Sequence, residues 1–423
     1  MLPEQNSTPV HPNALGITHW RLGKRAFRII RRAVKASRKM AKSGLARIVY
    51  SLPYLSKRDP RRSVITCREQ CQTVEKFAGT MGSVNRDWSI AVRPGEILVR
   101  EPSMCLDDHE ATRFKTESAK FQLGDRFETP AAFLTCFHRA KIEATDFLIV
   151  SHENRIIFES ALSDQGVLER NGILDRLWPY RVKRLRGAHI LLAHHGADTY
   201  YHWIIEALPK LSLIQEFSQL ASVPLIVPKT LNAFQRDSLK MLGVPSERLL
   251  GLDDGQWQTD QLFFPESIGR SGNPSRHAVR WLRKAFLTND YRPDSAFARI
   301  YITRRDAPRR RLANEAEIVS YLQGIGFTVV CLGDLAFAEQ IELFRNVRVV
   351  IAPHGAGLTN MVFASPGATI IEIFGDNYIN GCYWALASLC GHRHAFLTTP
   401  AQALDYSLSL ERLKALLKRV EPF

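Results

Sequence analysis

Short apolar runs alternate with helix-length stretches from about residue 188 onward. The first set has apolar runs at residues 189–193, 225–227 and 262–264, separated by helix-length stretches at residues 200–217 and 233–242. Strands of this length that alternate with helices are typical of βαβ units, in which crossover helices cover both faces of a parallel sheet. The pattern therefore predicts a parallel sheet in this part of the chain.

The alternation starts again after two segments rich in turn-forming residues, at 270–274 and 291–294. The expected strands are residues 299–303, 328–331, 347–352 and 369–374, and the expected helices are residues 277–287, 315–324, 337–344 and 358–363. Asn314 precedes the helix at 315–324 and Glu317 follows three residues later, so we expect a capping box there. A second doubly wound domain is the simplest interpretation.

The region before residue 186 has a weaker pattern. Apolar runs at residues 131–136 and 147–150 suggest strands, and the connections between them are charged. A chain of 423 residues is longer than one ordinary domain of about 100–200 residues. We therefore expect an N-terminal arm, a first α/β domain and a second α/β domain, at residues 1–65, 66–290 and 291–423.

The net charge of +15 is concentrated at the N-terminus. Residues 1–65 hold 15 of the 57 Lys and Arg residues and 2 of the 42 Asp and Glu residues, so residues 66–423 carry 42 basic and 40 acidic side chains. A folded domain that binds nucleic acid needs a basic surface to neutralise phosphates. We therefore expect no nucleic acid partner for the folded part.

The arm has the composition of a basic amphipathic helix. Residues 20–50 contain eleven Lys and Arg residues and no acidic residue, and helical spacing puts many of the intervening apolar side chains on one stripe. Such a segment can bind an anionic membrane surface, each basic residue contributing about 1 kcal/mol. The alternatives are a solvated, partly disordered tail and a segment that binds nucleic acid or a protein.

Other features favour a cytoplasmic location, with peripheral contact at the inner face of the plasma membrane. No run of 18 apolar residues is present, and the first twenty residues lack the order of a signal peptide. Seven cysteines, an odd number without a dense framework, fit a reducing compartment. Cys67 and Cys71 are two potential zinc ligands without two more at similar spacing, which is too few for a structural zinc site.

One cluster of candidate site residues follows the expected strand at 347–352. A turn with two glycines begins a short helix there, and its free backbone N–H groups can bind an anion. The glycines allow close approach of a diphosphate, and the helix N-terminus adds about half a positive charge. We expect a nucleotide to be bound by this cluster, which comprises His354, Gly355, Ala356, Gly357, Leu358, Thr359 and Asn360.

Two further groups extend this candidate nucleotide site. Arg304 and Arg305 follow the strand at 299–303, and their planar guanidinium groups can pair with phosphate oxygens; a solvated basic loop is the alternative. Glu372 lies inside the apolar strand at 369–374, where a carboxylate is costly unless it is hydrogen-bonded. Ribose hydroxyls would satisfy it, and so would a buried contact to a backbone N–H.

A separate cluster of candidate site residues follows the expected strand at 189–193. His202 and Glu206 are four residues apart on one face of a helix, within about 6 Å at Cβ. A carboxylate beside an imidazole can orient it, raise its basicity or itself remove a proton. The alternative is a histidine packed against the sheet with a solvated partner. Further residues expected at the acceptor side of the cleft are His195, Asp198 and Trp203.

Together these clusters resemble glycosyltransferase family 61, whose members include bacterial capsular-polysaccharide enzymes and eukaryotic xylosyl- and N-acetylglucosaminyltransferases. The resemblance covers about residues 188–395 and is carried by His202-x-x-x-Glu206 with Leu208-Pro209, by Tyr301 to Ala307 with Arg310 and Asn314-Glu315, and by Pro353 to Asn360 with Pro366-Gly367 and Glu372. It implies a GT-B fold, in which two Rossmann-like doubly wound α/β domains face a cleft. It also implies a nucleotide-sugar donor and inversion at the anomeric carbon.

The function implied is sugar transfer from a nucleotide-sugar donor to a glycan or lipid-linked glycan acceptor, in the biosynthesis of capsular or other cell-surface polysaccharide. Residues 66–290 would lie on the acceptor side and residues 291–423 would bind the donor. Glu206, or His202 supported by it, would take the proton of the acceptor hydroxyl. Arg304, Arg305 and the turn at His354 would stabilise the leaving diphosphate.

We expect no cofactor and no metal, because the sequence has no Asp-x-Asp triplet and arginines with a helix end can replace a divalent cation. An α/β-hydrolase would need a G-x-S-x-G motif, which is absent. A dehydrogenase would need a third glycine in the turn. A non-catalytic nucleotide-binding scaffold protein of an envelope-polysaccharide complex is the remaining alternative.

Overall fold

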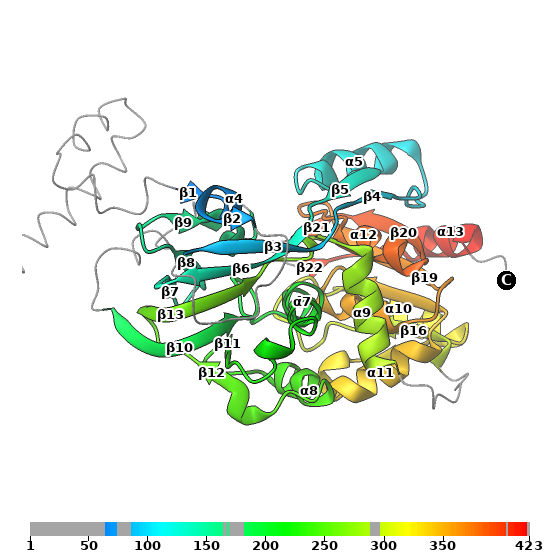
Figure 1. The fold of residues 1–423 in the computed structure, drawn as a ribbon. Coiled ribbons are helices and arrows are strands. Elements are labelled where there is room, and N and C mark those ends of the chain that lie inside the picture. Colours follow the sequence, from blue (N-terminus) through cyan, green and yellow to red (C-terminus); the bar gives the residue numbers. More distant parts are fainter. Residues whose placement is uncertain are drawn as a thin grey trace, which may run out of the picture. The chain divides into compact units, whose positions relative to one another are not determined.

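The computed structural model describes residues 64–73, 86–163, 167–168, 182–287, 297–402 and 405–420 (Figure 1). Apart from Val64 and Ile65, the expected arm lies outside the described residues, and so does the segment at 20–50 that we expect to contact a membrane. Among the residues described, no helix is both long and apolar enough to cross a bilayer.

The C-terminal sheet consists of five parallel strands. These are β16 (Arg299–Ile302), β17 (Thr328–Val330), β18 (Val349–Pro353), β19 (Thr369–Gly375) and β20 (Arg393–Thr399). Their order is β17-β16-β18-β19-β20, so the direction of strand order reverses between β16 and β18. In open α/β sheets, ligands bind at the carboxyl ends of the strands where the order reverses. The four strands expected here are confirmed.

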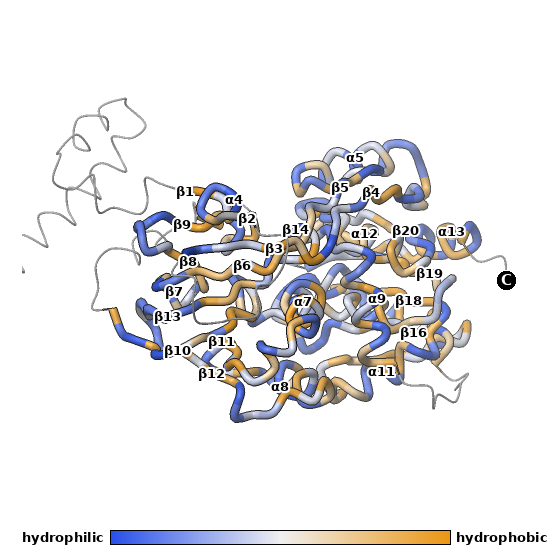
Figure 2. Tube along the Cα trace, viewed as in Figure 1, coloured by the Kyte–Doolittle hydropathy of each residue, from blue (hydrophilic) through white to orange (hydrophobic). Residues whose placement is uncertain are grey.

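Helices cover both faces of this sheet, as expected for a doubly wound fold. They are α9 (Arg276–Phe286), α10 (Glu315–Gly324), α11 (Phe337–Asn346), α12 (Cys382–Cys390) and α13 (Leu410–Val420). Val350 and Ala352 of β18 pack in one apolar cluster with α9, α11 and α12, whereas Val349 and Ile351 pack in another with α10 and α13. Because both faces are buried, β16, β18 and β19 are hydrophobic along most of their length (Figure 2).

The N-terminal sheet is mixed, which corrects the expectation of a purely parallel sheet. The strands β13 (Gln256–Pro265), β10 (Lys183–Leu191), β11 (Leu225–Val227) and β12 (Leu249–Gly251) lie side by side in this order and are parallel. On its other side β13 pairs antiparallel with β6 (Ala132–His138) and β7 (Lys141–Glu143). These two strands come from the region with the weak sequence pattern.

The remaining strands extend the N-terminal sheet or form small antiparallel pairs. Those of the sheet are β1 (Val64–Ile65), β2 (Gln72–Thr73), β3 (Trp88–Arg93), β8 (Leu148–Val150) and β9 (Ile156–Ile157); the pairs are β4 (Glu96–Val99) with β5 (Arg126–Thr129), and the hairpins β14 (Gly269–Arg270) with β15 (Asn273–Pro274) and β21 (Ala401–Gln402) with β22 (Asp405–Tyr406). The remaining helices are α4 (Cys67–Gln70), α5 (Asp108–Ala119), which lies between β4 and β5 in the sequence, and α8 (Ala233–Met241).

The single helix expected at residues 200–217 is three short helical segments. A π-helical turn, η5 (His202–Ala207), is followed by a 3₁₀ turn, η6 (Leu208–Lys210), and by α7 (Leu211–Ile214). Pro209 has no N–H to continue the i→i−4 ladder, so a regular helix cannot run through it. Single π turns occur often at functional sites.

The expected capping box at Asn314 does not form. Asn314 is the N-cap residue of α10, but its side chain makes no capping bond. Its amide instead bonds to the backbone of Leu408, donating to the carbonyl at 2.8 Å and accepting from the N–H at 3.0 Å, and donates to the Glu317 carboxylate at 3.0 Å. The side chain therefore connects α10 to the segment before α13.

One apolar cluster reaches both sheets. It contains Ile190 of β10 and Val227 of β11 from the N-terminal sheet and Ile300 of β16 and Val350 of β18 from the C-terminal sheet. The domain boundary that we expect at residue 290 lies outside the described residues, and it stays a prediction.

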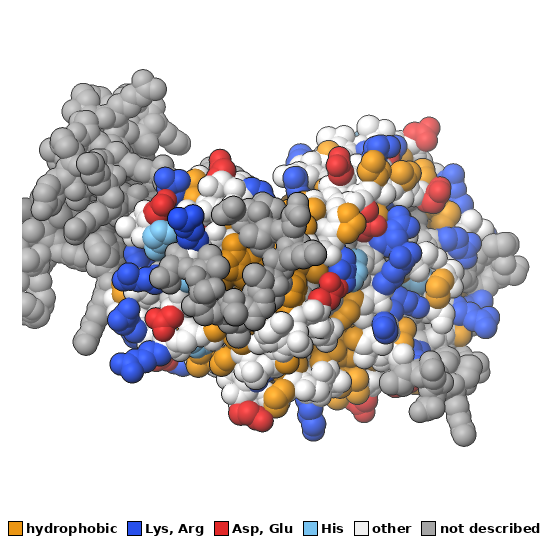
Figure 3. Space-filling model, in the orientation of Figure 1, with side chains coloured by type: hydrophobic (Ala, Val, Ile, Leu, Met, Phe, Trp, Pro, Cys, Tyr) orange, Lys and Arg blue, Asp and Glu red, His pale blue; other side chains and the backbone are white. Residues whose placement is uncertain are grey.

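On the face drawn in Figure 3, Lys and Arg side chains are spread toward both sides with acidic side chains among them.

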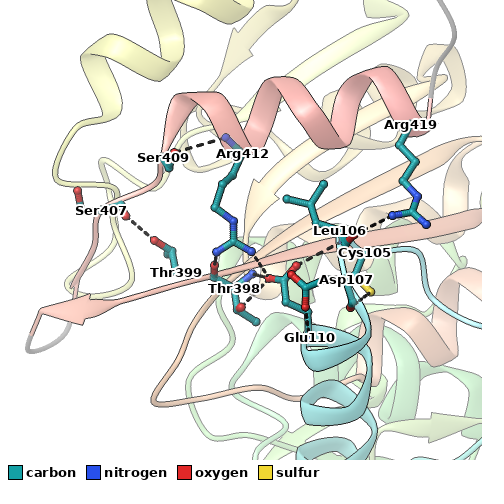
Figure 4. Close-up of polar contacts among 10 residues, drawn as sticks. All are labelled: Cys105, Leu106, Asp107, Glu110, Thr398, Thr399, Ser407, Ser409, Arg412 and Arg419. Atoms are coloured by element: carbon teal, nitrogen blue, oxygen red, sulfur yellow. Dashed lines mark hydrogen bonds and ion pairs between the residues drawn. The ribbon is translucent and has the colours of Figure 1, made fainter.

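Helix α5, from the region with the weak sequence pattern, packs on the C-terminal sheet (Figure 4). Its buried Glu110 accepts hydrogen bonds from the N–H and hydroxyl of Thr398 at 2.9 and 2.6 Å and pairs with Arg412 of α13 at 2.7 Å. Phe114 stacks on Phe396 with ring centroids 4.5 Å apart. The loop that follows α5 is thereby held at the carboxyl end of the sheet.

Replacing Glu110 by Gln tests this anchor. We expect the free energy of unfolding in urea to fall by about 2 kcal/mol, because a hydrogen bond to a charged group contributes roughly 1.5–3 kcal/mol. The matched control is Glu117→Gln on the same helix, where the pair with Lys120 is at the surface and should change stability by less than about 0.5 kcal/mol. Equal losses in the two variants would contradict the anchor.

Candidate active site

A cavity of about 340 Å³ lies where the strand order of the C-terminal sheet reverses. The turn after β18 lines it, together with the loop after α5, the start of η5, and the hairpin β14–β15. The residues on these four segments that line the cavity include His354, Gly355, Ala356, Phe121, Gln122, Tyr201, His202, Arg270, Gly272 and Asn273. Segments that follow strands of both sheets therefore meet at one cavity.

The turn after β18 is shaped around an arginine. A Cβ added to Gly355 would lie 1.8 Å from Nη1 of Arg304, so only glycine leaves room for the guanidinium. The backbone of Gly355 is extended, with φ of 175°, and the requirement for glycine is therefore steric rather than conformational. The turn begins the 3₁₀ helix η11 (Ala356–Phe363), whose first N–H groups have no partner within the helix.

Two cations without a carboxylate partner lie at this turn. Arg304 donates from Nε and Nη2 to the backbone oxygen of Arg309, at 3.4 and 3.2 Å. Among the described residues, no carboxylate lies within ion-pair distance of Arg304 or of Arg310, which lines the cavity. Burial, with the charge of Arg310, lowers the pKa of Arg304. An anion in the cavity would relieve this crowding of positive charge.

His354 is held from behind by a buried chain of hydrogen bonds. Its Nδ1 contacts Oε1 of Glu372, and Oε2 of Glu372 lies 3.1 Å from Nε2 of His394. Nδ1 of His394 lies 2.7 Å from the hydroxyl of Ser103. Burial raises the pKa of Glu372 well above the ordinary value and lowers the pKa of His354, and it lowers the pKa of His394 to about 3.

Burial thus disfavours charge on each of these groups, and with all of them neutral every hydrogen bond has one donor. Ser103 donates to His394, His394 donates to Glu372, and the protonated carboxyl group of Glu372 donates to Nδ1 of His354. The proton of His354 is then on Nε2, at the opposite edge of the ring. His354 therefore offers an N–H donor rather than an acceptor to the cavity that it lines.

The second histidine of the cavity is also held by a buried glutamate. Oε2 of Glu206 lies 2.7 Å from Nδ1 of His202, and Oε1 accepts the backbone N–H of Gly272 at 3.2 Å. The expected helical pairing of His202 and Glu206 is therefore present. Gly196, with φ of +83°, packs against the imidazole, since a Cβ there would lie 3.2 Å from Cδ2 of His202.

Glu206 differs from Glu372 in its charge. Burial alone would raise the pKa of Glu206, but the charge and hydrogen bond of His202, with the N–H of Gly272, outweigh burial and lower the pKa to about 2. Glu206 is therefore a carboxylate that accepts the Nδ1 proton of His202. In this tautomer Nε2 is the basic nitrogen of the ring.

Several residues expected to bind the donor do not line the cavity. Glu372 has no exposed surface, so we correct the expectation that it contacts ribose. Arg305 is exposed and pairs with Asp334, away from the turn. Within η11, Leu358 and Thr359 are buried. Three members of the expected set line the cavity, and these are His354, Gly355 and Ala356. Arg304 lies against Gly355 and does not itself line the cavity. Gly357, Leu358, Thr359 and Asn360 do not line it either, and the last three of these are buried.

The expected donor residues that do not line the cavity have structural contacts that explain their position. Asn360 accepts a hydrogen bond from Tyr200 at 2.5 Å and donates one to Gln340 at 2.8 Å. These two bonds connect η11 to the segment before η5 and to α11. A Cβ on Gly357 would lie 2.8 Å from Cδ1 of Leu332. These contacts fix the turn without placing the side chains in the cavity.

The three residues expected on the acceptor side also do not line the cavity. His195 lies 2.6 Å from Asp146, Asp198 is exposed on the surface, and Trp203 is fully buried and donates to Ser238 at 2.9 Å. Trp203 follows His202 directly on a helical turn, so when His202 faces the cavity Trp203 faces the core. This expectation is corrected.

Sequence reasoning missed several residues of the cavity. Gly272 and Asn273 lie in a turn-forming segment that we interpreted only as a boundary, whereas Arg310 belongs to the run of arginines that carries the family resemblance. Phe121 and Tyr378 lie in no motif, because their position depends on the packing of α5 and on the loop after β19. Among the described residues, no group of three or more His, Cys, Asp or Glu could hold a metal ion.

Glutamine substitutions at the two buried glutamates test their opposite protonation. Glu206→Gln should lower the free energy of unfolding at pH 7 by roughly 3 kcal/mol. The variant loses the favourable interactions of the carboxylate with His202 and the N–H of Gly272, which are the interactions that lower its pKa in the folded protein. Glu372→Gln should cost less than about 1 kcal/mol, because an amide donates and accepts as the protonated carboxyl group does. Urea denaturation measures both, and equal losses would show that Glu372 is ionised.

The pH dependence provides the control. The folded pKa of Glu206 lies below the ordinary value of 4.5, so its contribution to stability is present above pH 4.5 and is lost as the pH falls toward 2. The difference in stability between the wild type and Glu206→Gln should therefore shrink below pH 4.5. A difference that stays constant down to pH 3 would contradict the assignment.

Known proteins match this chain over a segment that includes His202 and His354. The model of the family described as glycosyltransferase 61 matches residues 200–371. The EGF domain-specific O-linked N-acetylglucosamine transferases of Bos taurus and Drosophila melanogaster are 31% and 33% identical over 106 and 107 residues, which cover 23% and 25% of this chain and 20% of each relative. The protein O-linked-mannose beta-1,4-N-acetylglucosaminyltransferase 2 of Xenopus tropicalis is 29% identical over 108 residues, 25% of this chain and 18% of the relative. The chain thus matches about a fifth of the length of these relatives.

These relatives overturn the expected cytoplasmic location at the inner face of the plasma membrane. The animal enzymes act in the secretory lumen, and EGF domains are disulfide-bonded modules of secreted proteins. The expectation rested in part on the cysteines. All seven are free and six are buried, and buried thiols are inert in reducing and oxidising compartments alike, so they do not identify the compartment.

The matched segment contains the pair His202–Glu206, Arg304 and His354, and it ends one residue before Glu372. Over residues 200–371 the chain matches the glycosyltransferase 61 family.

Proposed function

We propose that this protein is an inverting glycosyltransferase of GT-B type that transfers a sugar from a nucleotide-sugar donor to a hydroxyl group of a glycan or glycolipid. The observation that carries the proposal is the cavity itself. A turn with an arginine seated on a glycine, on the C-terminal sheet, faces a histidine–glutamate pair from the other half of the molecule. The turn and its arginine would bind the diphosphate of the donor, and the histidine–glutamate pair would take the proton of the acceptor hydroxyl.

His202 is the proposed general base, and Glu206 is a positioning residue. Glu206 is buried and does not line the cavity, whereas His202 does. Nδ1 of His202 is bonded to the carboxylate, so Nε2 takes the proton as the acceptor oxygen attacks the anomeric carbon. The ionised Glu206 stabilises the imidazolium that forms, as carboxylates do in catalytic triads.

The opposite wall of the cavity serves the leaving group. As the bond from the anomeric carbon to the phosphate oxygen breaks, its electron pair moves to the nucleoside diphosphate. Arg304, Arg310 and the N–H groups at the start of η11 stabilise the added negative charge. His354 donates from Nε2 to a phosphate oxygen. These groups supply the positive charge that a divalent cation would otherwise bring, so we propose transfer without a metal.

The biological context that we expect from the sequence stays a prediction. The relatives are named for transfer of N-acetylglucosamine to EGF domains and to protein-linked mannose. A role in capsular polysaccharide synthesis is what the family resemblance implies. We propose a glycan of the cell surface as the acceptor class.

The substitution His202→Gln tests the role of the base. We expect kcat for sugar transfer to fall by roughly 10²–10⁴-fold, the usual contribution of a general base, with unchanged affinity for a nucleoside diphosphate in calorimetry. The control is His109→Gln on the exposed surface of α5, which should keep full activity. If the wild type binds nucleotide and transfers no sugar to any acceptor tested, the scaffold alternative holds.

The substitution Gly355→Ala tests the diphosphate site. The added methyl group collides with Arg304, so we expect the dissociation constant of a nucleoside diphosphate to rise at least about tenfold. Gly324→Ala is the matched control, because a Cβ at that position of α10 would meet no atom within 4 Å. Equal nucleotide affinity in both variants would place the diphosphate elsewhere.

A further inference from the structure

Two exposed aromatic side chains meet at the mouth of the cavity. Phe121 and Tyr378 are each 40% exposed, and they belong to a small group of large hydrophobic side chains exposed on the described part of the chain. Their rings make an edge contact with centroids 6.0 Å apart, and both line the cavity. Exposed aromatic residues that gather at a polar cavity mark a binding surface.

Phe121 is held in place from the side of the catalytic pair. Its neighbour Gln122, with φ of 59°, accepts a hydrogen bond from Arg270 at 3.0 Å, and its backbone oxygen accepts one from Asn273 at 3.3 Å. Arg270 and Asn273 belong to the hairpin β14–β15, whose Gly272 binds Glu206. The ring of Phe121 is thereby attached to the structure that positions His202.

Tyr378 is held from the side of the diphosphate site. Its ring lies 5.4 Å from the imidazole of His354, in an edge contact, and the guanidinium of Arg310 lies 5.8 Å from its centroid. Its hydroxyl accepts a hydrogen bond from Asn380 at 3.3 Å. The two aromatic rings thus join the walls that we assign to the base and to the leaving group.

We propose that Phe121 and Tyr378 form a platform on which a pyranose ring of the acceptor glycan stacks; this inference rests on the proposed function. The C–H face of a pyranose is apolar and packs on the negative face of an aromatic ring. The amide groups of Gln122 and Asn380 and the guanidinium of Arg270 also line the cavity and suit the hydroxyl groups around the ring.

The position of Phe121 favours the acceptor over the nucleobase of the donor. The base of a bound nucleotide leaves the diphosphate on the side away from the sugar that is transferred. Phe121 is attached to the hairpin that holds Glu206, so a ring stacked on it lies beside His202, where the attacking hydroxyl must be. The platform is therefore part of the acceptor site.

The test measures two kinds of ligand on the full chain. Saturation-transfer NMR with methyl glycosides of glucose, galactose, mannose, xylose and N-acetylglucosamine reports sugar binding, and calorimetry with UDP and GDP reports nucleotide binding. Phe121→Ala and Tyr378→Ala should each weaken the binding of the glycoside that binds best by roughly tenfold, without a change in nucleotide affinity. Tyr378→Phe should keep glycoside binding, because the platform needs the ring.

The control is Met241→Ala, which removes another exposed hydrophobic side chain at the end of α8 and should change neither signal. Glycoside binding that is absent in the wild type, or unchanged in both alanine variants, overturns the platform. A loss of nucleotide affinity in the alanine variants assigns the rings to the base and also overturns it. Failure of the wild type to bind any nucleotide contradicts the proposed function instead, so the two failures are distinguishable.

Discussion

Two buried glutamates determine the geometry of the cavity, because a carboxyl group inside a protein must have all its hydrogen bonds satisfied or be neutral. Glu206 lies between His202 and the N–H of Gly272, which lower its pKa to about 2, whereas burial raises the pKa of Glu372 between His354 and His394. Each glutamate fixes the ring of one histidine that lines the cavity. One ring is left with a basic nitrogen and the other with an N–H donor, which are the two functions that a transfer reaction requires on opposite sides of the anomeric carbon.

The two histidines line one cavity because both sheets share one apolar core. Ile190 of β10 and Val350 of β18 belong to the same cluster, and Tyr200 of the segment before η5 bonds to Asn360 of η11. The reversal of strand order beside β18 then opens a crevice at the carboxyl ends of β16 and β18, and the absence of a side chain at Gly355 lets Arg304 pack against the turn that lines it. Fold and site thus depend on the same packed helices.

The sequence predicted what local patterns control. The strands of the C-terminal sheet are buried on both faces and stand out as apolar runs, and the spacing of His202 and Glu206 predicts their contact on any helical turn. The mixed N-terminal sheet was not predictable, because its antiparallel strands come from short runs with no crossover helices. The partner of Glu372 was not predictable either, since His394 lies on the next strand and its register with Glu372 is set by the sheet.

A crystal structure of the protein with a bound nucleoside diphosphate tests the central claim most directly. The account predicts that the diphosphate lies against the backbone of Gly355 and Ala356, with Arg304 and Arg310 on its oxygens, Nε2 of His354 within hydrogen-bond distance, and His202 across the cavity. A diphosphate bound away from this turn, or one with His202 on its nucleoside side, would contradict it.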